Sequence, residues 1–187
     1  MARMTTMIAL LRGVNVGGHN MIKMDSLRAL CESLGHCDVQ TYVQSGNVIF
    51  RTKERDMTKI ARKVEDAIEK KHGFRPDVIL RTTAEMREVI ARNPFAKRQG
   101  IEPGKLIVTF LADEPPAETK AAVLALKPVP EEIRVNGREL YIYFPDGSGR
   151  SKLVPTLSKV MKSKGTGRNW TSVSTLLEMA EKLEKNG

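Results

Sequence analysis

The sequence has few of the residues on which catalytic and metal sites most often depend. Its 187 residues include three histidines and two cysteines. Cys31 and Cys37 are six positions apart and match neither a CxxC motif nor a zinc-ligand pattern. No histidine has a spacing that would let it activate Ser45 as a nucleophile. The sequence therefore predicts no metal site, no cofactor and two reduced thiols, and it assigns no catalytic residue.

Long apolar runs are also missing near the N-terminus. The apolar run MIALL, residues 7–11, has five residues, too few for the apolar region of a signal peptide or for a membrane span. We therefore expect a cytoplasmic protein without membrane contact. Aromatic residues make up only 5% of the chain, so the core must consist mostly of aliphatic side chains and methionine.

Two segments lack acidic residues altogether. Neither residues 1–24 nor residues 147–177 contain aspartate or glutamate. The whole chain carries a net charge of +9. An excess of positive charge favours phosphorylated small molecules or nucleic acid as partners, and a basic protein without an anionic partner is the alternative.

Hydrophobic periodicity and turn residues predict the same order of elements twice. In the first half we expect strands at 6–11, 39–43, 47–50 and 78–81, and helices at 25–34, 54–72 and 82–92. In the second half we expect strands at 106–111, 133–135, 140–144 and 167–170, and helices at 115–126, 151–162 and from Thr171 onward. Each half reads βαββαβ plus a helix, which is the ferredoxin-like order.

The predicted fold class is therefore α+β, with two ferredoxin-like halves that suggest an internal duplication. A polar stretch at 97–104 divides the chain into residues 1–96 and 104–187. Whether the halves are separate lobes or share one sheet stays open.

Local signals refine the helices of this prediction. Thr82 and Glu85 have the spacing of a capping box, and Thr171 is expected to cap the last helix. Glu65, Asp66 and Glu69 form an acidic patch that we expect to be solvated and to lack a facing partner.

The first candidate site is the stretch LRGVNVGGHNMIK, residues 11–23. Gly17 and Gly18 permit close approach of the backbone to a ligand. Arg12 and Lys23 could neutralise an anion, and Asn15 offers an amide. The stretch fits neither a Walker loop nor GxGxxG, and a strand-to-helix turn that needs glycine is the alternative.

Two further stretches have candidate polar groups. Ser45 and Asn47 could point into the same cleft as the first loop, or could simply form a hairpin turn. Arg150, Ser151 and Lys152 follow a strand and begin a helix, where backbone amides and cationic side chains favour phosphate. A capped helix entry with solvated charges is the alternative there.

A fourth stretch adds an aromatic ring. Arg168 and Asn169 precede Trp170, the only tryptophan, whose indole could stack on a base or belong to the core. If the halves face each other, the polar stretches could converge on one basic cleft.

The motifs LLRGVNVGGHNMIKM, TYVQSGNVIF, NPF, GRSKL and TGRNWTSV together resemble a widespread bacterial family of unknown function. The resemblance implies a cytosolic α+β protein of about this size and brings no activity, substrate or cofactor. Its motifs single out the candidate residues already named together with Gly46. The best functional hypothesis is binding of a phosphate-bearing, nucleotide-like small molecule between the halves. The alternatives are a nucleic-acid-binding module and a structural or protein-interaction domain, and the sequence assigns no oligomeric state.

Overall fold

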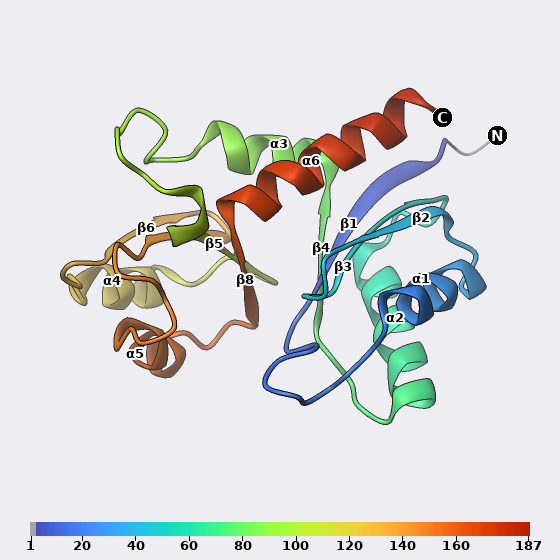
Figure 1. Cartoon of the computed structure of the whole chain (residues 1–187), viewed down its shortest axis with the longest axis horizontal. Helices are drawn as coiled ribbons and strands as arrows, with labels where there is room; N and C mark the ends of the chain where they lie inside the picture. Colours follow the sequence, from blue (N-terminus) through green and yellow to red (C-terminus); the bar gives the residue numbers. More distant parts are fainter. Residues whose placement is uncertain (1–2) are drawn as a thin grey trace. The chain divides into compact units, whose positions relative to one another are not determined.

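The computed structural model describes residues 3–187, which form two compact units (Figure 1). Residues up to 87 together with residues 175–187 form unit 1, and residues 88–174 form unit 2. Two helices, α3 (Thr83–Ala91) and α6 (Trp170–Lys185), contain residues of both units. The predicted α+β class is confirmed, whereas the predicted division into residues 1–96 and 104–187 stays a prediction. Within the described residues, no helix has the length and apolar character needed to cross a membrane.

Unit 1 contains a four-stranded antiparallel sheet with strand order β2-β3-β1-β4. Its strands are β1 (Thr5–Leu11), β2 (Cys37–Tyr42), β3 (Asn47–Thr52) and β4 (Val78–Thr82). Its crossover helices are α1 (Met24–Ser33) and α2 (Met57–His72), which lie on the same face of the sheet (Figure 1). This order and topology are ferredoxin-like.

Unit 2 repeats the arrangement with strand order β6-β7-β5-β8. Its strands are β5 (Leu106–Leu111), β6 (Glu132–Asn136), β7 (Glu139–Tyr143) and β8 (Gly165–Asn169). Its helices are α4 (Ala117–Ala125) and α5 (Leu153–Val160), and a short 3-10 turn, Pro103–Lys105, precedes β5. The two sheets are separate. The prediction of two ferredoxin-like halves is confirmed, and the shared-sheet alternative is wrong.

The core of unit 1 forms between its sheet and its crossover helices. On α2, Ile60, Val64 and Ile68 are fully buried, as their spacing of four residues predicts. Their neighbours include apolar side chains of β1, β3 and α1. Asp56 caps this helix by accepting a hydrogen bond from the backbone N–H of Lys59 at 3.1 Å, which explains why the helix begins at Met57 rather than at residue 54.

The two predicted helix caps have different outcomes. The capping box before α3 is confirmed, since the Thr82 N–H donates to Glu85 at 2.8 Å and the Glu85 N–H donates to Thr82 Oγ1 at 3.1 Å. The prediction that Thr171 caps the last helix is wrong. The cap is Asn169, whose Oδ1 accepts from the Ser172 N–H at 2.9 Å, so the cap lies two residues earlier and α6 begins at Trp170.

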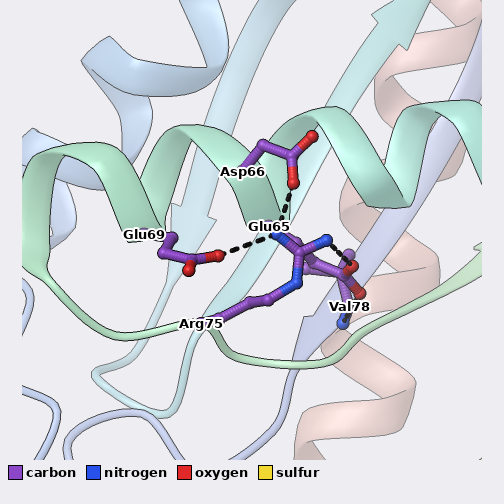
Figure 2. A network of polar contacts seen from close by, with 5 residues as sticks. All are labelled: Glu65, Asp66, Glu69, Arg75 and Val78. Atoms are coloured by element: carbon purple, nitrogen blue, oxygen red, sulfur yellow. Dashed lines mark hydrogen bonds and ion pairs between the residues drawn. The ribbon is translucent and has the colours of Figure 1, made fainter.

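The acidic patch on α2 has a partner that the sequence did not reveal. Figure 2 shows Arg75 among Glu65, Asp66 and Glu69, and its guanidinium group forms ion pairs with all three carboxylates. Glu65 also accepts a hydrogen bond from the Val78 backbone N–H at 3.0 Å. The patch was expected to lack the facing partner of a paired-carboxylate site, and Arg75 is a partner of another kind: these acids anchor the connection between α2 and β4.

Candidate anion-binding loops

The loop between β1 and α1 is held together by two asparagines. Asn15, with a φ of 55°, donates from its side-chain amide to the carbonyl oxygens of Ile22 at 3.0 Å and Gln44 at 2.7 Å, and it accepts from the Ile22 N–H at 2.8 Å. Asn20, with a φ of 52°, donates to the Gly13 carbonyl at 3.0 Å. Both side-chain amides donate to the loop's own backbone or to the adjacent turn, which is what a structural turn requires.

The remaining candidate residues of this loop are exposed. Gly17 and Gly18 have φ values of 57° and 78°, and a Cβ at Gly18 would meet no atom within 4 Å. Arg12 forms an exposed ion pair with Asp77 at 3.4 Å. Lys23 precedes α1 and its side chain makes no capping hydrogen bond. Solvent therefore reaches the two glycines and both cations.

The turn between β2 and β3 lies beside this loop, because Asn15 contacts Gln44. Asn47 is fully buried and donates to the Tyr42 carbonyl and to Ser45 Oγ, each at 2.9 Å. A Cβ on Gly46 would come within 3.0 Å of the Leu11 Cβ. Asn47 thus fixes the turn from within, and only Ser45 of the two predicted site residues is exposed.

The candidate residues near β8 also have structural contacts. Arg168 is buried in unit 2 and donates to Thr166 Oγ1 at 2.7 Å and to the Gly167 carbonyl at 2.9 Å. Burial lowers the pKa of its guanidinium group to about 10, so the side chain stays charged at neutral pH. Asn169 caps α6, and Trp170 is the half-buried first residue of that helix.

The third predicted stretch lines a cavity in unit 2, which we call the α5 cavity. It has a volume of about 390 Å³, and Arg150, Ser151 and Lys152 contribute to its wall together with Asp146 and Gly147. The chain leaves β7 and turns at Gly147, whose φ is 82°. It then enters α5 at Leu153. This short connection places both cations at one cavity.

Ser151 organises the entry to α5. Its hydroxyl donates to Glu131 Oε1 at 2.6 Å and accepts from the Leu153 N–H at 3.1 Å. The hydroxyl proton is therefore engaged by Glu131, so Ser151 acts as a positioning residue at this cavity. The interpretation of this stretch as a capped helix entry is consistent with these bonds, and the cations beside it remain exposed.

The opposite wall of the α5 cavity was not predicted from the sequence. It consists of the connection between α4 and β6, with the lining residues Leu126, Pro128, Val129, Pro130 and Glu131. The Val129 side chain is 88% exposed. The signal in the sequence is the pair of prolines around Val129, which restricts the backbone and keeps an apolar side chain outside a helix or strand.

The histidines, cysteines and carboxylates of residues 3–187 are the remaining groups with the chemistry to hold a metal ion or act as a nucleophile. No group of three or more histidine, cysteine or carboxylate side chains is arranged to hold a metal ion in that range. Cys31 and Cys37 are free thiols. Burial raises the pKa of the Cys31 thiol to about 12, so Cys31 is neutral and unreactive at physiological pH.

Comparisons with known proteins agree with this fold. No curated protein matches the sequence. A conserved bacterial protein from Streptococcus pneumoniae has a similar structure, with a TM-score of 0.73 and 20% sequence identity over 95% of this chain and 99% of that chain. At this identity the likeness shows the fold alone. The family model for a protein of unknown function, DUF1697, matches residues 4–141. The chain therefore belongs to the DUF1697 family.

Proposed function

We propose that unit 2 binds a phosphate-bearing small molecule in the α5 cavity. The observation that carries this proposal is that Arg150 and Lys152 line one cavity and that neither forms an ion pair within residues 3–187. An unpaired guanidinium group offers a planar fork of donors to a phosphate, and a lysine adds a mobile point charge. The net charge of +9 favours the approach of anions to the chain as a whole.

The rest of the wall supports a ligand with an organic part. Leucine, valine and proline side chains form the side of the cavity made by residues 126–130, and apolar walls with a few polar groups are typical of small-molecule sites. A volume of about 390 Å³ suits a molecule of nucleotide-like size. Asp146 and Glu131 also line the cavity, and their carboxylates favour a ligand that carries N–H donors beside its phosphate.

The test is isothermal titration of the purified protein with nucleoside monophosphates, sugar phosphates and inorganic phosphate. The double variant Arg150→Gln/Lys152→Gln should weaken binding by about tenfold or more, because each charged hydrogen bond contributes on the order of 1.5–3 kcal/mol. The matched control is Lys159→Gln/Lys162→Gln, which removes two exposed charges outside the cavity lining. Unchanged binding by the double variant would refute the proposal.

A second titration, with an oligonucleotide at two salt concentrations, distinguishes the nucleic-acid alternative. Backbone neutralisation of an oligonucleotide weakens steeply with salt, and it depends on total charge more than on any one side chain. Oligonucleotide binding that falls equally in the double variant and in further Lys→Gln controls would therefore favour a basic surface over the α5 cavity.

A further inference from the structure

Three arginines from separate segments of unit 1 line one pocket, which we call the arginine pocket. Arg3 precedes β1, Arg51 lies on β3 and Arg55 lies between β3 and α2. The pocket has a volume of about 460 Å³. Thr5 and Thr6 of β1 and Glu184 near the end of α6 also contribute to its lining, and Figure 1 shows the end of α6 beside the first residues of β1.

Strand register explains how two of these segments meet. Thr6 on β1 is the direct cross-strand partner of Arg51 on β3, so their side chains share one face of the sheet. Thr5 pairs with Thr52, and the chain then turns through residues 53–56 into α2. Arg55 in that turn is thereby brought to the same edge as Arg51.

The charges of this pocket are unbalanced. Glu184 is the one acidic side chain in its lining, against three guanidinium groups, and Gly187 also lines the pocket. A Cβ on Gly187 would clash with the Arg51 guanidinium group, so Arg3 and Arg55 are the two arginines left to meet a ligand. Arg51 also forms an ion pair with Asp38 at 3.3 Å, and the Asp38 side chain is half exposed. The guanidinium groups of Arg3 and Arg55 form no ion pair within the part of the chain that the structure describes. Like charges held close together repel, and a bound anion would relieve that repulsion.

We propose that the arginine pocket binds a small multivalent oxyanion, such as a phosphate, a diphosphate or a polycarboxylate. Guanidinium forks match the spacing of oxygens on phosphate and carboxylate groups, and several forks favour an anion with several oxygens. Thr6, whose side chain shares a face of the sheet with Arg51, adds a neutral hydroxyl donor at the pocket. This site belongs to unit 1 and is distinct from the α5 cavity.

The test uses the full chain carrying Arg150→Gln/Lys152→Gln, so that the α5 cavity does not contribute. Pyrophosphate, inorganic phosphate and citrate are titrated calorimetrically at constant ionic strength. We expect saturable binding of at least one of them, and a loss of about tenfold or more in affinity with Arg55→Gln and again with Arg3→Gln. Tighter binding of pyrophosphate or phosphate than of citrate would indicate a phosphate site, and the reverse order would indicate a carboxylate site.

The matched control is Arg62→Gln, which removes the same charge from an exposed position on α2 that does not line the pocket. Arg55→Lys keeps the charge but removes the fork, so its affinity should lie between those of the parent and Arg55→Gln. Melting temperatures check that each variant is folded. The proposal is overturned if none of the three anions binds, or if Arg62→Gln weakens binding as much as Arg55→Gln does. Neither result bears on the proposed binding in the α5 cavity, because that proposal is tested by the separate titration of the parent protein and the Arg150→Gln/Lys152→Gln variant.

Discussion

The side-chain amide of Asn15 donates a hydrogen bond to the backbone carbonyl of Gln44 across 2.7 Å. This bond joins the loop after β1 to the turn between β2 and β3, although the two residues are 29 positions apart. The most glycine-rich segment of the chain is therefore fixed by a side chain at its centre. The structure gives this loop a clear architectural role, while its exposed glycines remain free to meet a ligand.

Asn15→Asp is expected to destabilise the protein by about 2–3 kcal/mol. The substitution preserves shape but replaces the amide nitrogen, which donates to Ile22 and Gln44, with an oxygen that repels both carbonyls. Urea denaturation measures the effect. Gln40→Glu, the same chemical change at an exposed position on β2, is the control. Equal urea midpoints for the two variants would show that the hydrogen bonds of the Asn15 side chain contribute nothing to stability.

Comparing Gly46→Ala with Gly18→Ala separates the cost of backbone strain, which both variants have, from the cost of steric crowding, which only Gly46→Ala has. Both glycines have positive φ values, 82° and 78°, so each alanine has a backbone cost of about 1–2 kcal/mol. A Cβ at Gly46 would also lie 3.0 Å from the Leu11 Cβ, whereas Gly18 has open space. We expect Gly46→Ala to lower the melting temperature further than Gly18→Ala does. The reverse order would contradict the packing of this turn.

His36 predicts a pH dependence of stability. Its ring is buried against Phe50 with centroids 4.2 Å apart, and neither ring nitrogen has a hydrogen-bond partner. Burial lowers the pKa of His36 below its ordinary value of 6.5, and nearby Lys63 lowers it further. The unfolded chain therefore binds a proton that the folded chain resists. The free energy of unfolding should fall as pH drops below about 6.5.

His36→Phe should remove this contribution and raise stability at every pH. The substitution keeps an aromatic ring against Phe50 and eliminates two unsatisfied nitrogens, which cost on the order of 1–3 kcal/mol when buried. Thermal unfolding between pH 5 and pH 7.5 measures both effects. His19→Gln, at an exposed loop position, is measured over the same pH range as the control variant. If the stability of His36→Phe changed with pH as steeply as that of the parent, His36 would not be the source of the pH dependence.

Tyr141→Phe tests a buried hydrogen bond in unit 2. The Tyr141 hydroxyl donates to the Val89 carbonyl at 2.6 Å, and burial raises the pKa of the phenol. Its loss should destabilise the protein by about 1 kcal/mol. Tyr143→Phe is the comparison. The Tyr143 hydroxyl lies 3.5 Å from the Gly100 carbonyl, so the hydrogen bond that this substitution removes is weaker. Calorimetry should give Tyr141→Phe a lower melting temperature than Tyr143→Phe.

Much of the fold follows from local signals in the sequence. The apolar spacing on α2 and the reciprocal pair at Thr82 and Glu85 both predict what the structure shows. These signals lie within a few residues of the features they specify. The two ferredoxin-like halves could therefore be predicted from one sequence.

Strand β8 was harder to place because its sequence has little strand character. It was predicted near residues 167–170 and lies at Gly165–Asn169. A Cβ on Gly165 would come within 2.8 Å of Leu111, and one on Gly167 within 3.1 Å of Ile107. Both glycines lie close against β5, and glycine has low strand propensity when considered locally.

The contacts around the candidate sites depend on residues far apart in the sequence. Local spacing does not reveal that Glu131 would accept from Ser151, or that Arg3 would share a pocket with Arg51. Composition predicts either anionic partners or a basic protein without them, and only the geometry says which cations share a cavity. Ser151 and Asn47 then proved to hold backbone and turns together.

Unit 1 is made from two lengths of chain with the whole of unit 2 between them. During synthesis on the ribosome, residues up to 87 emerge well before residues 175–187, which include Glu181, the partner of Arg87 at 3.1 Å. Unit 2, by contrast, is one continuous stretch. The nascent chain can therefore complete the later-emerging unit 2 first, and the earlier-emerging unit 1 becomes complete only after its final segment has been translated.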